Sequence, residues 1–228
     1  MIELKDVSVT YDKTKHLALS DVNLEIGTGE FVFVVGKSGA GKSTFIKLLL
    51  KELEPSLGQI KIDARNITQM KKRDIPYYRR KLGIVFQDFR LLSEKTVYGN
   101  VAFAMEIVEK SPSEIKDRVN EVLELVGLSH RADYFPDQLS GGEQQRVGIA
   151  RAIVNKPDFI ICDEPTGNLD PNTSKDILHI LENINNQGTT IIMATHDKEI
   201  VNYMQKRVIA LSGGKIIKDG RGGYPNED

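Results

Sequence analysis

The glycine-rich segment Gly36–Thr44, which reads GKSGAGKST, constrains the chain more than any other feature. It follows the short apolar run Phe31–Val35 and leads into Thr44–Lys51, a segment of good helix formers without Gly or Pro. A buried strand, a loop of the pattern G-x-x-x-x-G-K-[ST] and a helix, in this order, are typical of a phosphate-binding P-loop. Such a loop ends at a helix N-terminus, where backbone N–H groups and the helix dipole favour an anion. The segment therefore predicts a chain that binds a nucleoside triphosphate.

The residue types inside this loop have separate tasks. Glycine allows the backbone to curl around phosphates without Cβ clashes. Lys42 is expected to reach the β- and γ-phosphates, and the Ser43 hydroxyl is expected to ligate Mg²⁺. The predicted phosphate-binding residues are Gly36, Lys37, Ser38, Gly39, Ala40, Gly41, Lys42, Ser43 and Thr44.

Composition narrows the class of protein. With 228 residues the chain can bury a substantial core, and its net charge of −1 gives no overall attraction to nucleic acid or anionic membrane. The single cysteine, Cys162, cannot form an internal disulfide and is expected to be a small core residue. The N-terminus is charged at once, and no apolar run approaches the roughly 18 residues of a membrane span. We expect a cytosolic chain that binds no nucleic acid.

Polar side chains follow three further predicted strands. Gln87 ends Leu82–Phe86, Asp163 and Glu164 end Phe159–Cys162, and His196 follows Thr189–Thr195. Gln87 and Asp163 offer the oxygen ligands that Mg²⁺ prefers, so they join Ser43 as predicted metal ligands. Glu164 is expected to orient or deprotonate a water that attacks the γ-phosphate. Asp163 could act on the ion directly or through water. The alternatives are a polar residue that merely closes a strand for Gln87, a solvated strand end for the carboxylates, and a structural role for His196.

A second predicted anion site lies at Leu139–Arg146, which reads LSGGEQQR and opens a helix that we expect over Val147–Val154. Ser140, Gly141 and Gly142 would present backbone N–H groups there; an ordinary capped helix is the alternative. The remaining expected strands are an antiparallel pair over 2–10 and 19–26, another strand over 59–63, and a hairpin over 208–218. The remaining expected helices are a scaffold helix over 111–127 capped by Ser111 and Glu114, and a helix over 174–184 after a turn at 166–171.

The basic stretch 71–81 carries six cations around Tyr77 and Tyr78. A solvated helix face and a contact with anionic lipid or an acidic partner both fit it.

Taken together, these segments resemble the nucleotide-binding subunit of the ABC ATPase superfamily over essentially the whole chain. In this resemblance Tyr11 is the aromatic that stacks on adenine, and Gly36–Thr44 is the Walker A loop. Gln87 begins the Q-loop, and Leu139–Gln144 is the signature. The rest of the match comprises the Walker B strand Phe159–Glu164, the D-loop Asn168–Asp170, with Asp170 a further nucleotide-site residue, and the switch histidine His196.

The resemblance implies an α/β P-loop fold of the ABC ATPase type: a mixed or parallel core sheet with an antiparallel β subdomain and an α-helical subdomain. One ABC ATPase domain would span 1–228, with the core and β subdomain in about 1–86 and 157–228 and the helical subdomain in about 87–156. It also implies ATP hydrolysis with Mg²⁺ and a homodimer closed by ATP. Catalytic roles would fall to Glu164, His196, Lys42 and Gln87.

Within the superfamily the chain resembles the bacterial cell-division ATPases, on Ile75-Pro76, Arg79–Leu92, Lys95–Met105, Arg207-Val208 and Arg221–Tyr224. That branch implies a four-span integral membrane partner, a place on the cytoplasmic face of the membrane, and indirect activation of peptidoglycan hydrolases during division. Phe89, Arg90 and Tyr98 would flank the groove that receives the partner. The main alternative is the energising ATPase of a lipoprotein-releasing or macrolide-type exporter, which shares Pro165–Asp170. A soluble ABC ATPase and a nucleotide-gated scaffold are the remaining alternatives.

Overall fold

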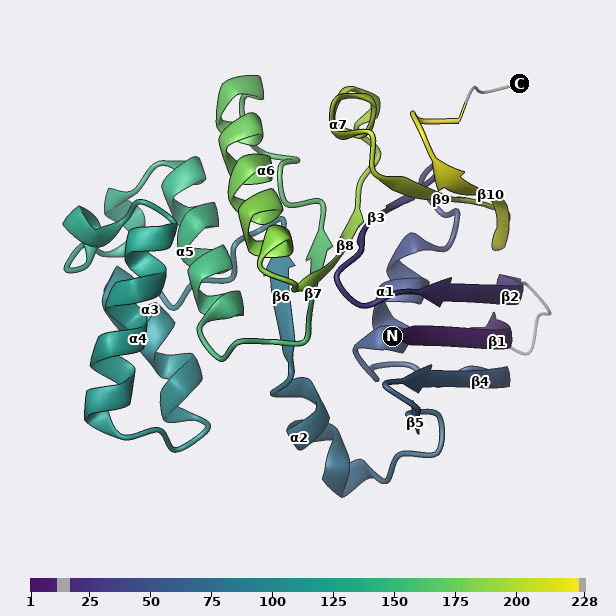
Figure 1. Ribbon diagram of the computed structural model, residues 1–228, viewed down its shortest axis with the longest axis horizontal. Coiled ribbons are helices and arrows are strands. Elements are labelled where there is room, and N and C mark those ends of the chain that lie inside the picture. Colours follow the sequence, from purple (N-terminus) through teal and green to yellow (C-terminus); the bar gives the residue numbers. More distant parts are fainter. Residues whose placement is uncertain (12–16, 226–228) are drawn as a thin grey trace. The chain divides into compact units, whose positions relative to one another are not determined.

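The computed structural model describes residues 1–11 and 17–225, and its elements are labelled in Figure 1. The chain divides into two compact units, one made of residues 1–79 and 190–228 and the other of residues 80–189. The helical subdomain predicted over 87–156 falls inside the second unit.

The first unit contains an antiparallel sheet in the order β2-β1-β4-β5. Its strands are β1 (Ile2–Thr10), β2 (Leu17–Ile26), β4 (Leu57–Ile62) and the short β5 (Arg65–Asn66). Ile2 lies opposite Ile26 on one side and Ile62 on the other. All three side chains are buried, as expected when apolar residues alternate along strands with one covered face. The two antiparallel strands predicted from the alternation are confirmed.

A second group of strands in this unit carries the P-loop. β3 (Phe31–Val35) runs parallel to both β8 (Thr190–Ala194) and β9 (Arg207–Ser212). β10 (Lys215–Arg221) pairs antiparallel with β9, which confirms the predicted hairpin. Every residue of β3 and β8 is buried, as is typical of parallel strands covered on both faces. The helix α7 (Lys198–Met204) connects β8 to β9.

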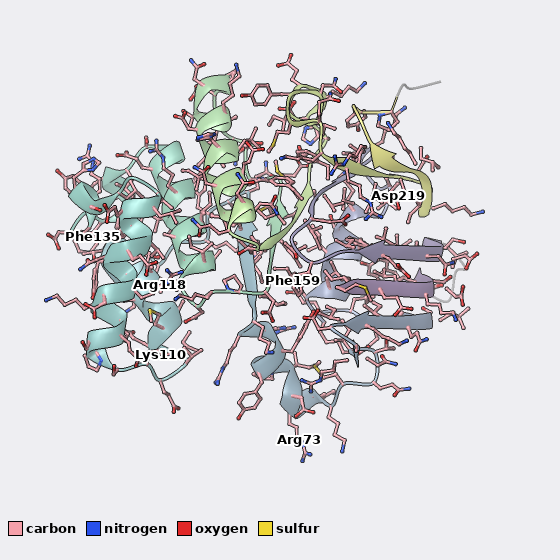
Figure 2. The ribbon with its side chains drawn as sticks, viewed as in Figure 1. Arg73, Lys110, Arg118, Phe135, Phe159 and Asp219 are labelled. Atoms are coloured by element: carbon pink, nitrogen blue, oxygen red, sulfur yellow. The ribbon has the colours of Figure 1, made fainter. Side chains whose placement is uncertain are left out.

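The helix after the P-loop, α1 (Lys42–Leu49), is closed at its carboxyl end by the basic stretch. The 3₁₀ turn η1 (Lys72–Asp74) and α2 (Ile75–Arg79) form this stretch. The Arg79 guanidinium donates to the carbonyls of Leu50 (2.9 Å) and Lys51 (3.2 Å), and the buried Tyr78 hydroxyl donates to the Leu49 carbonyl. Burial raises the pKa of Tyr78. Tyr78 and Arg79 therefore donate hydrogen bonds to carbonyl groups at the carboxyl end of α1. Arg73, labelled in Figure 2, is exposed.

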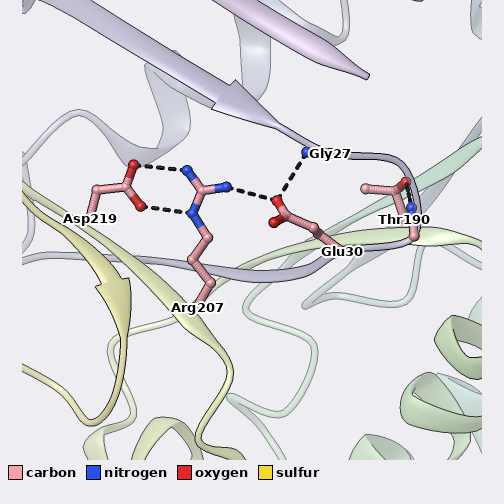
Figure 3. Close-up of polar contacts among 6 residues, drawn as sticks. Gly27, Glu30, Thr190, Arg207 and Asp219 are labelled. Atoms are coloured by element: carbon pink, nitrogen blue, oxygen red, sulfur yellow. Dashed lines mark hydrogen bonds and ion pairs between the residues drawn. The ribbon is translucent and has the colours of Figure 1, made fainter.

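Arg207 ties three segments of the first unit together (Figure 3). Its guanidinium donates to both carboxylate oxygens of Asp219 (2.7 and 2.8 Å) and to Glu30 Oε2 (2.7 Å). Glu30 Oε2 also accepts from the Gly27 N–H at 3.0 Å. Hydrogen bonding to Asp219 raises the Arg207 pKa further above its usual value. The β9–β10 hairpin is thereby fixed to the turn that leads into β3.

The second unit contains the parallel pair β6 (Leu82–Phe86) and β7 (Phe159–Asp163) with four longer helices. The helices are α3 (Val97–Glu106), α4 (Pro112–Leu125), α5 (Gly141–Ile153) and α6 (Pro171–Asn186), with 3₁₀ turns η2 (Ser129–Arg131) and η3 (Pro136–Gln138). α5 packs against β6, α3, α4 and α6, so it is the central helix of this unit.

Two helices begin earlier than the sequence predicts. α5 starts at Gly141 rather than Val147, because the Ser140 side chain caps it by accepting from the Glu143 N–H. α6 starts at Pro171 rather than Ser174, because Asp170 caps it and Pro171 fits the first helical position. α3 and α7 are not predicted. In the part of the chain that the structure describes, no helix combines the length and apolar character needed to cross a membrane.

Candidate functional site

The P-loop connects β3 to α1 through a backbone that only glycine accommodates. Gly41, the N-cap of α1, has a φ of 115°, and a Cβ there would lie 2.8 Å from the Ala18 carbonyl oxygen. Gly36 also has a positive φ, and a Cβ there would collide with the Leu211 carbonyl oxygen. Neither position tolerates another residue without a backbone shift. The local fold is thus the one that the G-x-x-x-x-G-K-[ST] pattern predicts.

Lys42 lies over the loop that it is expected to serve. Its ammonium donates to the carbonyl oxygens of Gly36 (2.6 Å) and Lys37 (3.3 Å). The next residue, Ser43, is exposed on the first turn of α1. Thr44 is buried, and its hydroxyl shares a hydrogen bond of 3.1 Å with the Tyr11 hydroxyl. Tyr11 is 53% exposed, which leaves ring surface for the predicted adenine stacking.

A cavity of about 430 Å³ lies beside this loop. Residues 36–40 form one wall, and the β9–β10 hairpin with Tyr224 forms the other. His196 stands at the same edge of the sheet, because Val34 pairs with Ala194 in register and Gly36 and His196 each lie two residues further on. The carboxyl ends of parallel strands are where such sheets bind ligands. Within the first unit, the structure thus brings the P-loop and His196 to one sheet edge.

Gln87, Asp163 and Glu164 meet at one edge in the second unit. Phe86 pairs with Asp163 in register, so Gln87 and Glu164 each follow a paired position. Glu164 has a φ of 49°, and its carbonyl accepts from the Gly167 N–H at 3.1 Å, which closes a tight turn. A non-glycine residue in the left-handed region is uncommon and often marks a functional position.

The turn after β7 also contacts the Q-loop. The Gln87 amide donates to Asn168 Oδ1 at 3.4 Å, and the Asn168 amide donates to the Gln87 carbonyl at 3.3 Å. A Cβ on Gly167 would lie 2.8 Å from Gln87 Nε2, so glycine leaves the room that this contact needs. The structure thus joins the start of the Q-loop directly to the D-loop.

The predicted metal ligands suit Mg²⁺ by their chemistry. Ser43, Gln87 and Asp163 supply a hydroxyl, an amide oxygen and a carboxylate oxygen. Mg²⁺ binds through one or two carboxylates and substrate phosphates while it keeps several waters. Over residues 1–11 and 17–225, no three His, Cys, Asp or Glu side chains gather into a cluster that could hold a metal by themselves. Binding of Mg²⁺ by these three residues stays a prediction.

The signature begins α5 with a capping box. The Ser140 N–H and hydroxyl both donate to Glu143 Oε2 at 2.9 Å, and Arg131 donates to Glu143 Oε1 at 3.2 Å. Hydrogen bonding to the Ser140 backbone, more than any other cause, lowers the pKa of Glu143. Gly142 is buried, and a Cβ there would collide with the Thr173 methyl group at the start of α6.

Asp170 has a local task in the structure. Its carboxylate accepts from the N–H groups of Asn172 (3.0 Å) and Thr173 (3.1 Å) and from the Thr173 hydroxyl, and these bonds lower its pKa. It is the N-cap of α6. Contact with a nucleotide stays a prediction for this residue.

The structure adds two side chains that the sequence analysis did not single out. Arg151 of α5 donates to the carbonyls of Phe89 (2.8 Å) and Arg90 (2.7 Å) in the Q-loop. Gln145, one residue after the signature, is fully buried in α5. Both are polar residues on the face of α5 that is otherwise apolar, and this position in the sequence pattern could have indicated a special role. Cys162 is buried as expected, and burial raises the pKa of its thiol.

Comparison with known proteins identifies the family. The sequence profile of the ABC transporter family matches residues 19–167, and the chain belongs to this family. It is an ABC ATPase, a P-loop protein that binds and hydrolyses ATP.

Relatives of known name match the whole chain. It is 57% identical to cell division ATP-binding protein FtsE of Bacillus subtilis, over all of both chains. It is 52% identical to the protein of the same name from Mycobacterium tuberculosis, over all of this chain and 99% of the relative. Among solved structures, a dimeric ATP-binding cassette in a post-hydrolysis state bound to ADP and Pi superposes with a TM-score of 0.85 and 35% identity, over 98% of this chain and all of the other.

Proposed function

We propose that this chain is the ATPase subunit of a membrane complex that acts in cell division, of the kind formed by FtsE with FtsX. The observation that carries the proposal is the 57% identity over the full length of both chains with a protein named for cell division. The partner would be an integral membrane protein with four spans, and the chain would lie on the cytoplasmic face of the membrane. Closure of the ATPase would act across the membrane on peptidoglycan hydrolases.

In this proposal the chemistry is in-line transfer of the γ-phosphoryl group to water, catalysed by positioning and charge stabilisation. Lys42 exchanges its bonds to the Gly36 and Lys37 carbonyls for the phosphates. Glu164 holds or deprotonates the attacking water, and His196 contacts the γ-phosphate. Ser43 and Gln87 would hold Mg²⁺, with Asp163 acting through water, and the bound ion would neutralise developing charge on the phosphates.

We further propose that two copies close on two ATP molecules. Ser140, Gly141 and Gly142 of one copy would meet the γ-phosphate held by Lys42 of the other, because the N-terminal end of a helix favours an anion. The solved relative whose description is dimeric with ADP and Pi supports this arrangement. Hydrolysis removes the contact that favours the closed pair, so the pair reopens.

The Q-loop is the proposed contact with the membrane partner. Gln87 and Arg90 are exposed, and Phe89 and Tyr98 are half-buried beside them. This surface combines a cation with aromatic side chains, as interface residues often do. Charge reversal at Arg90 should therefore weaken assembly with the partner.

The deciding experiment captures tagged Glu164→Gln protein from solubilised membranes with ATP present and identifies the associated proteins by mass spectrometry. Lys42→Ala, which should not bind ATP, is the matched control. A four-span protein with an extracellular loop domain, enriched over the control, is the expected result. A larger permease would instead assign the chain to an exporter, and recovery without any membrane protein would overturn the membrane-complex proposal.

A further inference from the structure

The Q-loop has an unusual backbone two residues after Gln87. Phe89 has a φ of 56° and Arg90 a φ of 48°, so two consecutive non-glycine residues lie in the left-handed region. Each of them places Cβ close to a carbonyl oxygen, a conformation that persists only where surrounding contacts impose it.

The loop's own interactions are at the surface. The Arg90 guanidinium lies 3.9 Å from the centroid of the Phe86 ring, and its Nε donates to Asp88 at 3.1 Å. Both charged side chains of this ion pair are more than half exposed, where such pairs contribute little. These contacts shape the Arg90 side chain. In the backbone, the Arg90 N–H donates to the Asp88 carbonyl at 2.5 Å, which closes a tight turn around Phe89 but does not fix that turn to another element.

The anchor is Arg151. Its two terminal nitrogens donate to the carbonyl oxygens of Phe89 and Arg90 at 2.8 and 2.7 Å, so one planar fork bridges both left-handed residues. Burial lowers the pKa of Arg151, in keeping with a guanidinium held inside the unit. Arg151 lies on α5, the helix that begins at the signature. A Cβ on Gly141 would also lie 3.7 Å from the Phe89 ring, so the same helix meets the loop twice.

We propose that Arg151 is a positioning residue for Gln87. By fixing the Phe89–Arg90 turn, its fork sets the path of the Q-loop after β6. Together with the two hydrogen bonds between Gln87 and Asn168, it thereby holds the Gln87 amide at the edge where Asp163 ends β7. It touches neither nucleotide nor metal and acts only through the loop. This inference rests on the proposed role of Gln87 as an Mg²⁺ ligand. It means that α5, the helix that begins at the signature, controls the position of the Gln87 side chain.

The test is Arg151→Lys, which keeps the positive charge but loses the fork. Removal of a group that orients a metal ligand typically weakens metal affinity by about 10- to 100-fold. We therefore expect the Mg²⁺ concentration for half-maximal ATP binding and hydrolysis to rise by about tenfold. ATP affinity measured in EDTA should stay within about twofold, because the P-loop is unchanged. Amide hydrogen exchange over 87–92 should become faster in the variant.

Arg118→Lys is the matched control, since Arg118 (labelled in Figure 2) also bridges two consecutive carbonyls in the same unit, through its Nε and one terminal nitrogen. It donates to the carbonyls of Ile153 and Val154 at 3.0 Å, at the carboxyl end of α5 and not in the Q-loop. This variant should lose stability and leave the Mg²⁺ dependence unchanged. An equal Mg²⁺ shift in both variants would show general loosening of the unit and overturn the positioning role.

Gln87→Ala separates the inference from the function beneath it. If Gln87→Ala raises the Mg²⁺ requirement and Arg151→Lys does not, the positioning role of Arg151 alone is wrong. If Gln87→Ala leaves the Mg²⁺ requirement unchanged, the proposed metal role of Gln87 is wrong, and the inference is wrong with it.

Discussion

At the scale of single residues, the two carboxylates that end β7 differ in backbone. Asp163 completes the parallel ladder with Phe86, whereas Glu164 turns into the left-handed region and starts a tight turn. One carboxylate is therefore held by the sheet and the next by a strained turn. Strain of this kind persists where the surrounding structure and function require it.

Glu164→Gln should abolish most of the hydrolysis while ATP still binds. A positioned general base contributes about 10²- to 10⁴-fold, so turnover should fall by at least about 100-fold. Phosphate release measures turnover, and a fluorescent ATP analogue measures binding. Glu124→Gln, which removes an exposed carboxylate from α4, is the control and should retain activity. Turnover of Glu164→Gln near the wild-type rate would remove Glu164 from the mechanism.

Gln145 is a buried amide whose polar atoms are not used for hydrogen bonding within the described residues. Among the described residues, neither its amide nitrogen nor its amide oxygen has a hydrogen-bond partner. An unsatisfied buried polar group costs about 1–3 kcal/mol. Gln145→Leu should therefore raise the melting temperature, by about 2–4 °C for each kcal/mol in a chain of this size.

The neighbouring Gln144 provides the control for this substitution. Its amide donates to the Leu139 carbonyl at 3.2 Å, so Gln144→Leu should not raise the melting temperature. Differential scanning calorimetry of both variants makes the comparison. A lower melting temperature for Gln145→Leu would mean that this amide is hydrogen-bonded in the native protein.

At the scale of elements, the sequence predicts best where local chemistry decides. α4 begins after Ser111 with Pro112 at its first position, and the capping box with Glu114 is present as expected. β3, the P-loop and α1 are also predicted well, because glycine positions and apolar periodicity determine local structure over only a few residues. α3 escapes prediction because apolar and small residues fill most of it, with no clear helical stripe.

The contacts of Arg151 could not be predicted for a different reason. They join a helix to the backbone of a loop about 60 residues earlier, and their geometry depends on two left-handed residues. Neither Phe89 nor Arg90 is a residue type that signals positive φ. The sequence pattern therefore does not predict which carbonyl groups will accept hydrogen bonds from the Arg151 guanidinium.

The cap of α4 gives a pH prediction. Hydrogen bonds from the Ser111 side chain and backbone, with Lys110, lower the pKa of Glu114 from 4.5 to about 2. A carboxylate whose pKa is depressed by folding stabilises the folded state above its unfolded pKa and loses this effect as pH falls through the folded value. The wild type should therefore exceed Glu114→Gln in stability at pH 6, and the difference should shrink from pH 4.5 toward pH 2.

Urea unfolding at pH 6, 4.5 and 3.5 measures that difference. Glu124→Gln removes the same charge from α4 away from the capping box and serves as the control. A difference between the wild type and Glu114→Gln that stays constant across these pH values would contradict the capping explanation.

At the scale of the whole molecule, the proposed pairing of two copies on ATP makes Lys42 the residue to test. Lys42→Ala should lose ATP binding and remain monomeric with ATP, whereas Glu164→Gln should become a dimer. Light scattering coupled to size-exclusion chromatography reports the mass directly. Lys47→Ala, an exposed lysine on the same helix, should behave as wild type. Dimers of Lys42→Ala that require ATP would contradict the P-loop assignment.

Cys162 has a practical consequence for studying such pairing. It is the single cysteine of the chain, it is fully buried, and burial together with the charge of Asp163 disfavours its thiolate. Because the thiolate is the form that reacts with labelling reagents, the natural chain should react with them very slowly. A cysteine introduced at exposed Ser113 would then carry one spin label per copy. A pair of copies would then have a single distance between its two spin labels, and a change in that distance would report opening or closing of the pair.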